Sequence, residues 1–362
     1  MGLAPYSNRE KHSEPLKFFL NSLKVKSIDF RVNPKIKDRF FYFKKGLEKF
    51  RFDNIAGALQ EFTEIRIVEW FKNIYLRFKV KNFIFSGGVA NNVKANKILL
   101  DQKFVESLWV PPGPGDESLC IGAAYCYHYK KLGYKKTFTF LKPLKNAYLG
   151  QNFDESKIKI FESNPIIKKN FYFKKDKDYK TSAKLLAKNE ILLFCQGKQE
   201  FGQRALGHRS ILANPSSKEI VKKINDTIKM RDFWMPFTPS ILKEDADKYF
   251  LNPKKNNSEY MTICYDTTEL GRKRFEAAVH PYDYTIRPQL VDKKTCKNYY
   301  KLISEFKKIT QVGGLLNTSL NMHEYPIINE PNDIIKEIIM KTDKKINFNI
   351  LINDNLFILN KN

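Results

Sequence analysis

Cysteine and long apolar runs are scarce in this sequence. It has five cysteines, an odd number without CxxC spacing, which argues against a disulfide framework and favours a reducing compartment. No apolar run approaches the ~18–20 residues that a membrane span needs. The first six residues lack the charged-then-apolar pattern of a signal peptide. We therefore expect a cytoplasmic protein with no membrane partner.

Acidic residues are also few. Lys and Arg number 64 against 39 Asp and Glu, a net charge of +25, which taken alone suggests an anionic partner such as nucleic acid. The cations are mostly Lys and are dispersed along the chain, so a nucleic-acid-binding stripe is not indicated. The 362 residues, 42% of them hydrophobic, leave room for two domains with real cores.

The most informative stretch is residues 196–212, QGKQEFGQRALGHRSIL. It follows an apolar run, residues 191–195, whose length suits a buried strand. Its glycines allow close backbone approach, while Lys198, Arg204 and Arg209 bring three cations together in the sequence. Free N–H groups with convergent Arg and Lys favour a phosphate or carboxylate. From the spacing alone, a glycine-rich connection with solvated charges is the alternative.

Four further stretches carry polar residues at strand or helix ends. A helix with Ser216 and Glu219 spaced as a capping box leads to Lys229, Arg231 and the run FWMPFTPS at 233–240. Residues 280–289 read HPYDYTIRPQ, and residues 315–327 read LLNTSLNMHEYPI. A strand at 82–85 meets SGGVANN, where Asn91 or Asn92 can cap the next helix. The positive N-terminal end of that helix favours anions.

Two other helices are indicated near the N-terminus. Asp53 is a plausible N-cap for a helix of apolar period that begins there. Asp116 stands at a loop-to-helix junction after PPGPG, where an N-cap carboxylate is the ordinary interpretation. Later in the chain, a helix near 178–188, a helix from Asp333 and two strands at 346–351 and 355–359 are expected.

Together these stretches resemble the O-carbamoyltransferases, the family of nodulation and antibiotic-tailoring carbamoyltransferases. Residues 197–212 match every fixed position of that family's G-x-x-E-x-G-x-R-A-L-G-x-R-S-I-L, and residues 228–240 match its I-K-x-R-x-x-x-x-P-F-x-P-S. Two departures stand out: His208 replaces the usual Asn, and Glu324 replaces the Gly of L-L-N-T-S-F-N-x-x-G. If position 324 has a positive φ, Glu there costs about 1 kcal/mol.

The resemblance implies an α/β (α+β) chain with two domains. Residues 1–145 would be the C-terminal half of an actin-like carbamoyl-transfer domain, 146–156 a linker, and 157–362 a YrdC-like domain that forms carbamoyladenylate. The opening MGLAPY resembles an internal segment of the family, which would place the first lobe of the actin-like domain outside this polypeptide. A fragment, a subunit that works with a separate N-terminal lobe, and a decayed copy are the three interpretations.

The resemblance also implies substrates and residues. The second domain would join carbamoyl phosphate to ATP with Mg²⁺, and the first would transfer the carbamoyl group to a hydroxyl acceptor, a sugar or a secondary metabolite, with a divalent metal such as iron. The expected catalytic residues are Lys198, Arg204, Arg209, Ser210, Lys229 and Arg231. The expected substrate- or nucleotide-binding residues are Gly87, Gly88, Asn91, Thr285, Arg287, Gln289, Asn317 and Ser319. Asp116 would be a metal ligand, with two histidines that this chain lacks.

Two other functions stay open. Related actin-like and YrdC-like proteins make threonylcarbamoyl adenosine in tRNA, and the basic charge suits tRNA, although the motifs match the O-carbamoyltransferases better. The second open function is that of a remnant that binds a nucleotide without turnover. The departures from the family motifs at His208 and Glu324 favour this interpretation.

Overall fold

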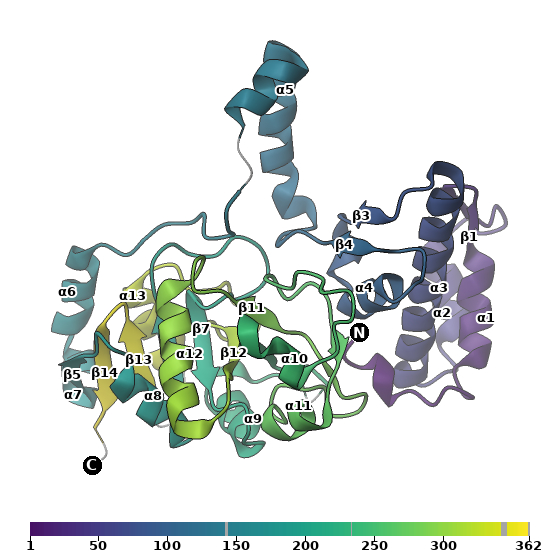
Figure 1. Ribbon diagram of the computed structural model, residues 1–362. Helices are drawn as coiled ribbons and strands as arrows, with labels where there is room; N and C mark the ends of the chain where they lie inside the picture. Colours follow the sequence, from purple (N-terminus) through teal and green to yellow (C-terminus); the bar gives the residue numbers. More distant parts are fainter. Residues whose placement is uncertain (142–143, 233, 342–345, 361–362) are drawn as a thin grey trace.

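The computed structural model describes residues 1–141, 144–232, 234–341 and 346–360. Its centre is an eight-stranded mixed sheet in the order β11-β8-β12-β7-β6-β13-β14-β5, in which β11–β8 and β13–β6 are parallel and the other pairs antiparallel (Figure 1). Its strands are β5 (Phe171–Lys175), β6 (Leu192–Cys195), β7 (Arg209–Ala213), β8 (Thr238–Leu242), β11 (Gln289–Val291), β12 (Gly314–Ser319), β13 (Asn349–Ile352) and β14 (Asn355–Leu359).

Both faces of this sheet are covered, which explains its unbroken apolar strands. Successive residues of β6 point to opposite faces: Leu192 and Phe194 enter one core, and Leu193 and Cys195 enter the other. The helices of this part are α6 (Glu155–Ser163), α7 (Pro165–Asn170), α8 (Lys180–Ala187), α9 (Glu219–Ile224), α10 (Ala246–Tyr249), α11 (Glu269–Arg274), α12 (Lys297–Thr310) and α13 (Pro331–Asp333). A small ladder pairs β9 (Tyr265–Asp266) with β10 (Thr285–Ile286).

The N-terminal part is mainly helical. It comprises α1 (Ser13–Ser22), the hairpin β1 (Leu23–Lys26) and β2 (Asp29–Val32), α2 (Arg39–Leu47), α3 (Phe52–Phe78), β3 (Asn82–Ile84), α4 (Val93–Leu100), β4 (Ser107–Trp109) and α5 (Leu119–Phe140). Strands β3 and β4 form a separate parallel pair. Helix α5 stands away from the body and bends at Gly133, whose φ is +72° (Figure 1).

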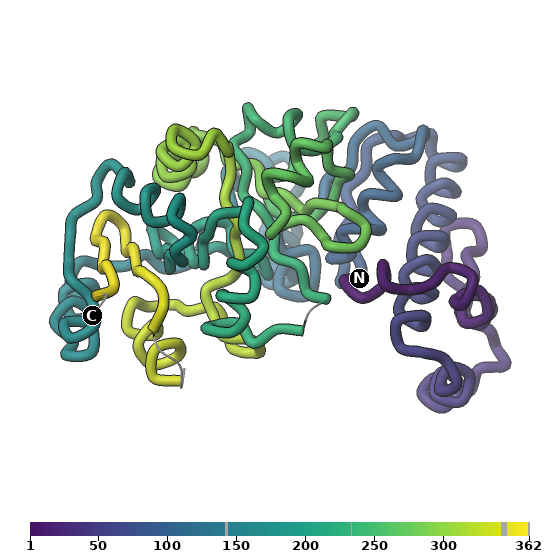
Figure 2. The backbone as a smooth tube through the Cα atoms, turned by 90° about the horizontal axis from the view of Figure 1, so that it is seen from below, coloured from purple at the N-terminus to yellow at the C-terminus, as the bar shows by residue number. Residues whose placement is uncertain are grey.

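The two parts share a core. One cluster of buried side chains contains Phe71 and Leu108 from the N-terminal part together with Tyr265 and Leu302 from the C-terminal part. In Figure 2 the chain begins near the junction between them, at the N label. The domain boundary at 146–156 stays a prediction, but packing across the junction means that the two parts support each other. None of the described helices has the length and apolar character of a membrane span.

Most of the predicted elements are confirmed, namely the α/β class, the strand before the signature, the helix near 178–188 and the two last strands. The predicted caps are less accurate. Asp53 is not an N-cap, because α3 begins one residue earlier with Arg51 at the cap. The Ser216–Glu219 capping box is wrong: α9 begins at Glu219, and the Ser216 hydroxyl donates to the Arg274 carbonyl instead. Asn92 caps α4, accepting from the Ala95 N–H.

The last helical segment begins two residues before the predicted Asp333. Its N-cap is Glu330, which forms a reciprocal capping box with Asp333. Pro331 occupies the first helical position, where its lack of an N–H has no cost.

Candidate functional site

Three arginines share a cavity between the two parts of the chain. A cavity of about 450 Å³ and an adjoining hollow of about 100 Å³ are both lined by Arg204, Arg231 and Arg287. Arg204 comes from the loop after β6, Arg231 from the segment between α9 and β8, and Arg287 from the segment after β10. On the opposite side the larger cavity is lined by residues 1–3 and by Lys94 of α4. We call these two spaces the three-arginine cavity.

The arginine charges of this cavity are not neutralised within the described residues. None of the three arginines forms an ion pair with a described carboxylate, and no Asp or Glu lines either space. Burial lowers the pKa of all three, and the pKa values of Arg204 and Arg287 are lowered further by neighbouring arginines. Guanidinium groups stay protonated even so. The three arginines are half-buried, and partly desolvated cations without partners are stabilised when an anion joins them, so the arrangement favours an anionic ligand.

Lys229 lies beside this cavity and fixes its wall. Its side chain is fully buried and donates to Ser319 Oγ at 3.1 Å and to Asn321 Oδ1 at 2.6 Å. Burial, followed by the charge of Arg231, holds its pKa well below the ordinary value. Ser319 lines the smaller hollow, so Lys229 acts on the ligand space through Ser319. Asn321 was not predicted, although it occupies a fixed Asn position of the motif at 315–324.

A polar network lies beneath the arginines. Asn317 Nδ2 donates to the Ala205 carbonyl at 3.0 Å and to Ser240 Oγ at 2.9 Å. Gln289 Nε2 donates to the Leu206 carbonyl at 2.8 Å. Asn317 also lines the smaller hollow and leaves its Oδ1 without a partner there, whereas Gln289 does not line it. The network fixes the backbone just after Arg204 and leaves one acceptor free for a ligand.

The signature also contains residues that shape its own loop. The Arg209 guanidinium is buried and donates to the carbonyls of Gln196, Gly197, His208 and Gln151. It lies over the Phe153 ring, 3.8 Å from the centroid. The geometry therefore does not support Arg209 as an anion-binding cation; its hydrogen-bonding capacity is used to close the loop.

Two other expected catalytic residues lie away from the cavity. Ser210 is buried, and its hydroxyl accepts from the Gly207 N–H at 3.1 Å. Lys198 is exposed, and neither residue lines the three-arginine cavity. The loop they belong to is held by Glu200, whose carboxylate accepts from the N–H groups of Leu206, His208 and Arg209.

His208 is a neutral packing residue. Its ring stacks on Tyr148 with centroids 3.6 Å apart, and its Nδ1 contacts the Lys198 carbonyl at 2.6 Å. Burial lowers its pKa to about 4. Since a carbonyl can only accept, Nδ1 carries the proton and Nε2 faces the Cys296 sulfur at 3.7 Å. The departure from the family's Asn is thus accommodated by stacking.

A second histidine connects the two parts of the chain at the cavity. His280 donates from Nε2 to the Gly2 carbonyl at 2.9 Å, and its Nδ1 accepts from the Tyr282 N–H. Burial lowers its pKa, so it is neutral. Asp283 receives the Thr285 hydroxyl at 2.8 Å and forms an ion pair with Lys94. Lys94 was not predicted, because nothing in its local sequence shows that α4 faces this cavity.

Glu324 has a φ of +67°, so the predicted strain at this position is present. It lies next to His323, which lines the larger cavity. The loop that carries both residues is exposed at Glu324.

The residues predicted in the N-terminal part face a different hollow. A space of about 720 Å³ is lined by Gly87 and Asp116 but not by Gly88 or Asn91. Gly87 has a φ of +103°, and its N–H donates to the Pro114 carbonyl, which joins the two loops. Asp116 is exposed. Among the described residues no three His, Cys, Asp or Glu side chains are grouped to hold a metal.

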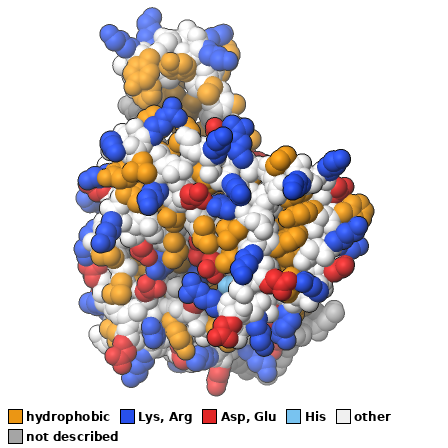
Figure 3. Space-filling model, turned by 90° about the vertical axis from the view of Figure 1, so that its right-hand side faces the viewer, with side chains coloured by type: hydrophobic (Ala, Val, Ile, Leu, Met, Phe, Trp, Pro, Cys, Tyr) orange, Lys and Arg blue, Asp and Glu red, His pale blue; other side chains and the backbone are white. Residues whose placement is uncertain are grey.

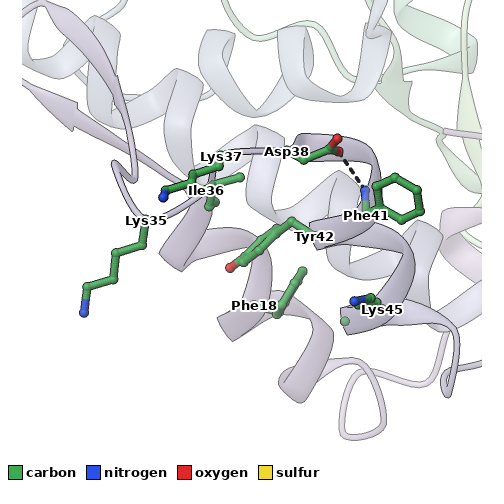
Figure 4. A pocket seen from close by; sticks show the side chains of 9 residues that line it. Phe18, Lys35, Ile36, Lys37, Asp38, Phe41, Tyr42 and Lys45 are labelled. Atoms are coloured by element: carbon green, nitrogen blue, oxygen red, sulfur yellow. Dashed lines mark hydrogen bonds between the residues drawn. The ribbon is translucent and has the colours of Figure 1, made fainter.

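A further hollow beside α2 contains none of the predicted residues (Figure 4). It has a volume of about 470 Å³ and lies where Phe18 stacks on Tyr42 with centroids 4.5 Å apart. Its one carboxylate, Asp38, accepts from the Phe41 N–H and caps α2. Its other charged side chains are lysines that point outward, so it resembles an ordinary helix junction.

Comparison with known proteins assigns a family to both parts of the chain. Residues 18–125 match the model of the carbamoyltransferase N-terminus, and residues 183–358 that of the carbamoyltransferase C-terminus. The uncharacterized protein MJ1058 of Methanocaldococcus jannaschii is 33% identical over 300 residues, covering 82% of this chain and 48% of that protein. The nodulation protein NolO of Bradyrhizobium diazoefficiens is 29% identical over 343 residues, covering 92% of this chain and 61% of that protein.

A solved structure of full-length HypF in the phosphate- and nucleotide-bound form is similar to 53% of this chain and 22% of its own, at a TM-score of 0.35 and 16% identity. That score is low, and the assignment rests on the sequence matches. This chain spans about half the length of the MJ1058 protein that it matches. The two family models and the nodulation relatives agree, and the chain belongs to the carbamoyltransferase family of transferases.

Proposed function

We propose that the three-arginine cavity is the carbamoyladenylate-forming site of an ATP-dependent O-carbamoyltransferase. The observation that supports this most is the set of half-buried guanidinium groups of Arg204, Arg231 and Arg287, which no described carboxylate neutralises. Both proposed substrates, carbamoyl phosphate and ATP, are polyanions. The negative charges of the two substrates repel each other. Fixed cations offset this repulsion and allow the two substrates to come together.

In the proposed reaction, carbamoyl phosphate loses its phosphate to water, and an oxygen of the resulting carbamate attacks the α-phosphorus of ATP. The bond between that phosphorus and the bridging oxygen breaks, and pyrophosphate leaves with the electron pair. The products are carbamoyladenylate, pyrophosphate and phosphate. The arginines would bind the phosphates, and the free Oδ1 of Asn317 and the hydroxyl of Ser319 would orient the carbamoyl amide.

Mg²⁺ would enter this site with ATP and be bound by phosphate oxygens, because no Asp or Glu lines the cavity. The apolar wall formed by Leu3, Trp234 and Phe237 suits a nucleoside. Lys94 and Thr285 on the opposite side would complete the polar surroundings.

Carbamoyl transfer to a hydroxyl acceptor is proposed at the hollow beside Gly87 and Asp116. A metal centre there is not complete, since the described residues group no three His, Cys, Asp or Glu side chains around Asp116. We therefore derive no step through a metal. Transfer is proposed to need residues from outside this chain, which spans 48% of its relative MJ1058.

The test is carbamoyl-phosphate-dependent exchange of labelled pyrophosphate into ATP by the purified chain. We expect exchange in the wild type and in Arg77→Ala, an exposed arginine at the end of α3, and its loss in Arg231→Ala. A folded chain that binds ATP but shows no exchange would contradict catalysis and favour the nucleotide-binding remnant.

A further inference from the structure

Helix α5 and strands β3 and β4 carry apolar side chains that the described chain leaves uncovered. Thr137 is the only buried residue of α5. Leu119 at the base of the helix is 67% exposed, and Ile84 at the end of β3 is 73% exposed. With Trp109, Tyr125 and Leu144, these side chains line the hollow that contains Gly87 and Asp116. We call this surface, from α5 to β3 and β4, the open face (Figures 1 and 3).

The apolar residues of α5 surround the helix. Tyr127 and Tyr129 are two positions apart and therefore point to different sides, and both are exposed. A helix that rests on a membrane surface has a single apolar stripe above a polar face. Apolar side chains that point to more than one side of a helix are ordinarily covered by protein. The distribution on α5 therefore favours a protein over a lipid surface.

The β3–β4 pair also indicates that a protein covers the open face. Each strand has three residues, and parallel strands are ordinarily covered on both faces. Phe83 and Leu108 point into the shared core, whereas Ile84 and Trp109, one position further on each strand, point outward. A two-stranded sheet with one bare face is marginally stable by itself. A covering layer is therefore expected on the outer face.

The charge of the open face excludes a second copy of this chain as the best occupant. From residue 118 to residue 153 the sequence contains no Asp or Glu, whereas α5 carries Lys130, Lys131, Lys135 and Lys136. Figure 3 shows Lys and Arg side chains next to apolar ones on the projecting helix. Two copies meeting through this surface would place cations against cations, which is destabilising. Asp and Glu on the occupant would instead pair with them.

We propose that the open face binds a second polypeptide of different sequence, whose apolar surface is bordered by Asp and Glu and which completes the hollow beside Asp116. The proposal rests on the proposed function, and the relative MJ1058 has about as many residues outside the matched region as inside it. Those outside residues are the natural source of such a layer. Binding would bury Leu119, Ile84 and Trp109 and close the hollow.

The test is co-expression of the full chain with the part of MJ1058 that lies outside the matched region, so that each can fold against the other. The complex is measured by sedimentation, with Leu119→Glu as the disrupting variant. Phe40→Glu is the matched control, because Phe40 is a 69% exposed side chain on α2, outside the open face. The chain alone is examined by sedimentation and with vesicles of neutral and of anionic phospholipid.

We expect a one-to-one complex whose affinity falls at least tenfold in Leu119→Glu, is unchanged in Phe40→Glu and weakens as salt is raised. The chain alone should be monomeric and should not bind vesicles. Absence of the complex, or equal affinity in both variants, would overturn the proposal. So would a dimer of the chain, or vesicle binding, that Leu119→Glu abolishes. Pyrophosphate exchange by the chain alone is scored separately, so that a failure of docking and a failure of the proposed function are distinguishable.

Discussion

The three-arginine cavity and the open face are incomplete in different ways. In the cavity what lacks a partner is charge: Arg204, Arg231 and Arg287 line a space to which no described carboxylate contributes. At the open face the charges are solvated, and what lacks a partner is apolar surface such as Ile84 and Leu119. Half-buried cations that no described carboxylate neutralises indicate a small anionic ligand, whereas exposed apolar side chains indicate a polypeptide.

The two regions also differ in how their functional residues are supported. Around the cavity, the network of Asn317, Gln289 and Ser240 fixes the backbone near Arg204, and Lys229 fixes Ser319. At the open face, Asp116 is exposed in a loop. Catalytic groups must be held by their surroundings to be effective. Under the proposed function, this difference favours adenylation by the chain alone over carbamoyl transfer.

The largest effect is expected for Arg204→Ala. Removing one of three unpaired cations that bind transition-state charge should lower the rate of pyrophosphate exchange by about 10²–10³. Unfolding free energy should change little, because the guanidinium makes no ion pair with a described residue. Exchange kinetics and denaturant unfolding measure the two effects, with Arg77→Ala as control. If the free energy of unfolding fell by as much as the activation free energy of exchange rose, the cavity would not be a ligand site.

Arg209→Ala should show the reverse pattern, in which the main effect is on stability. This variant leaves the carbonyls of Gln196, Gly197, His208 and Gln151 without their donor, so unfolding free energy should fall by about 3 kcal/mol. Urea denaturation of the two arginine variants gives the comparison directly. If Arg209→Ala retained full stability but lost exchange, Arg209 would belong with the anion-binding cations after all.

The two arginines also show how far the sequence could predict this site. The pattern RALGHRS identifies two cations but cannot tell one that faces a cavity from one that bonds to carbonyls. Arg209 starts β7, paired with Cys195 of β6, and this places its side chain among the backbone turns of residues 196–197. That outcome depends on strand register, which the local pattern does not fix.

The part of the site that the sequence does not predict depends on contacts between residues that are distant in the sequence. The fixed positions of the motifs found Arg231, Arg287, Asn317 and Ser319, which the structure brings together. The sequence could not predict Lys94 or the Gly2–His280 contact, because both depend on how α4 and the N-terminal segment pack on the C-terminal part. By contrast, the positive φ at Glu324 followed from a Gly in the motif, since backbone conformation is local.

A moderate effect is expected for pH through His208. Its pKa is about 4 in the folded chain against 6.5 for the free side chain, so the unfolded state binds the proton more tightly between these values. Unfolding free energy should therefore fall as pH is lowered from 6.5 to about 4. Because part of the ring reaches solvent, we expect a loss of about 2 kcal/mol.

The matched variant is His208→Asn, which has the residue usual in the family and does not titrate. Its stability between pH 6.5 and pH 4 should decline less steeply than that of the wild type. Thermal unfolding at several pH values measures the difference. Identical slopes would mean that the stacked histidine already takes up its proton in the folded chain.

The smallest effect is expected for Asp116→Asn, and it tests the separation of the two regions directly. Asp116 lines the hollow at the open face, and no described residue lines both that hollow and the three-arginine cavity. Pyrophosphate exchange should therefore change less than about twofold, the range of an ordinary surface substitution. The control is Asp29→Asn, an exposed carboxylate in the β1–β2 hairpin. If Asp116→Asn abolished exchange while Asp29→Asn did not, adenylation would depend on the open face, and the two regions would have to be treated as one site.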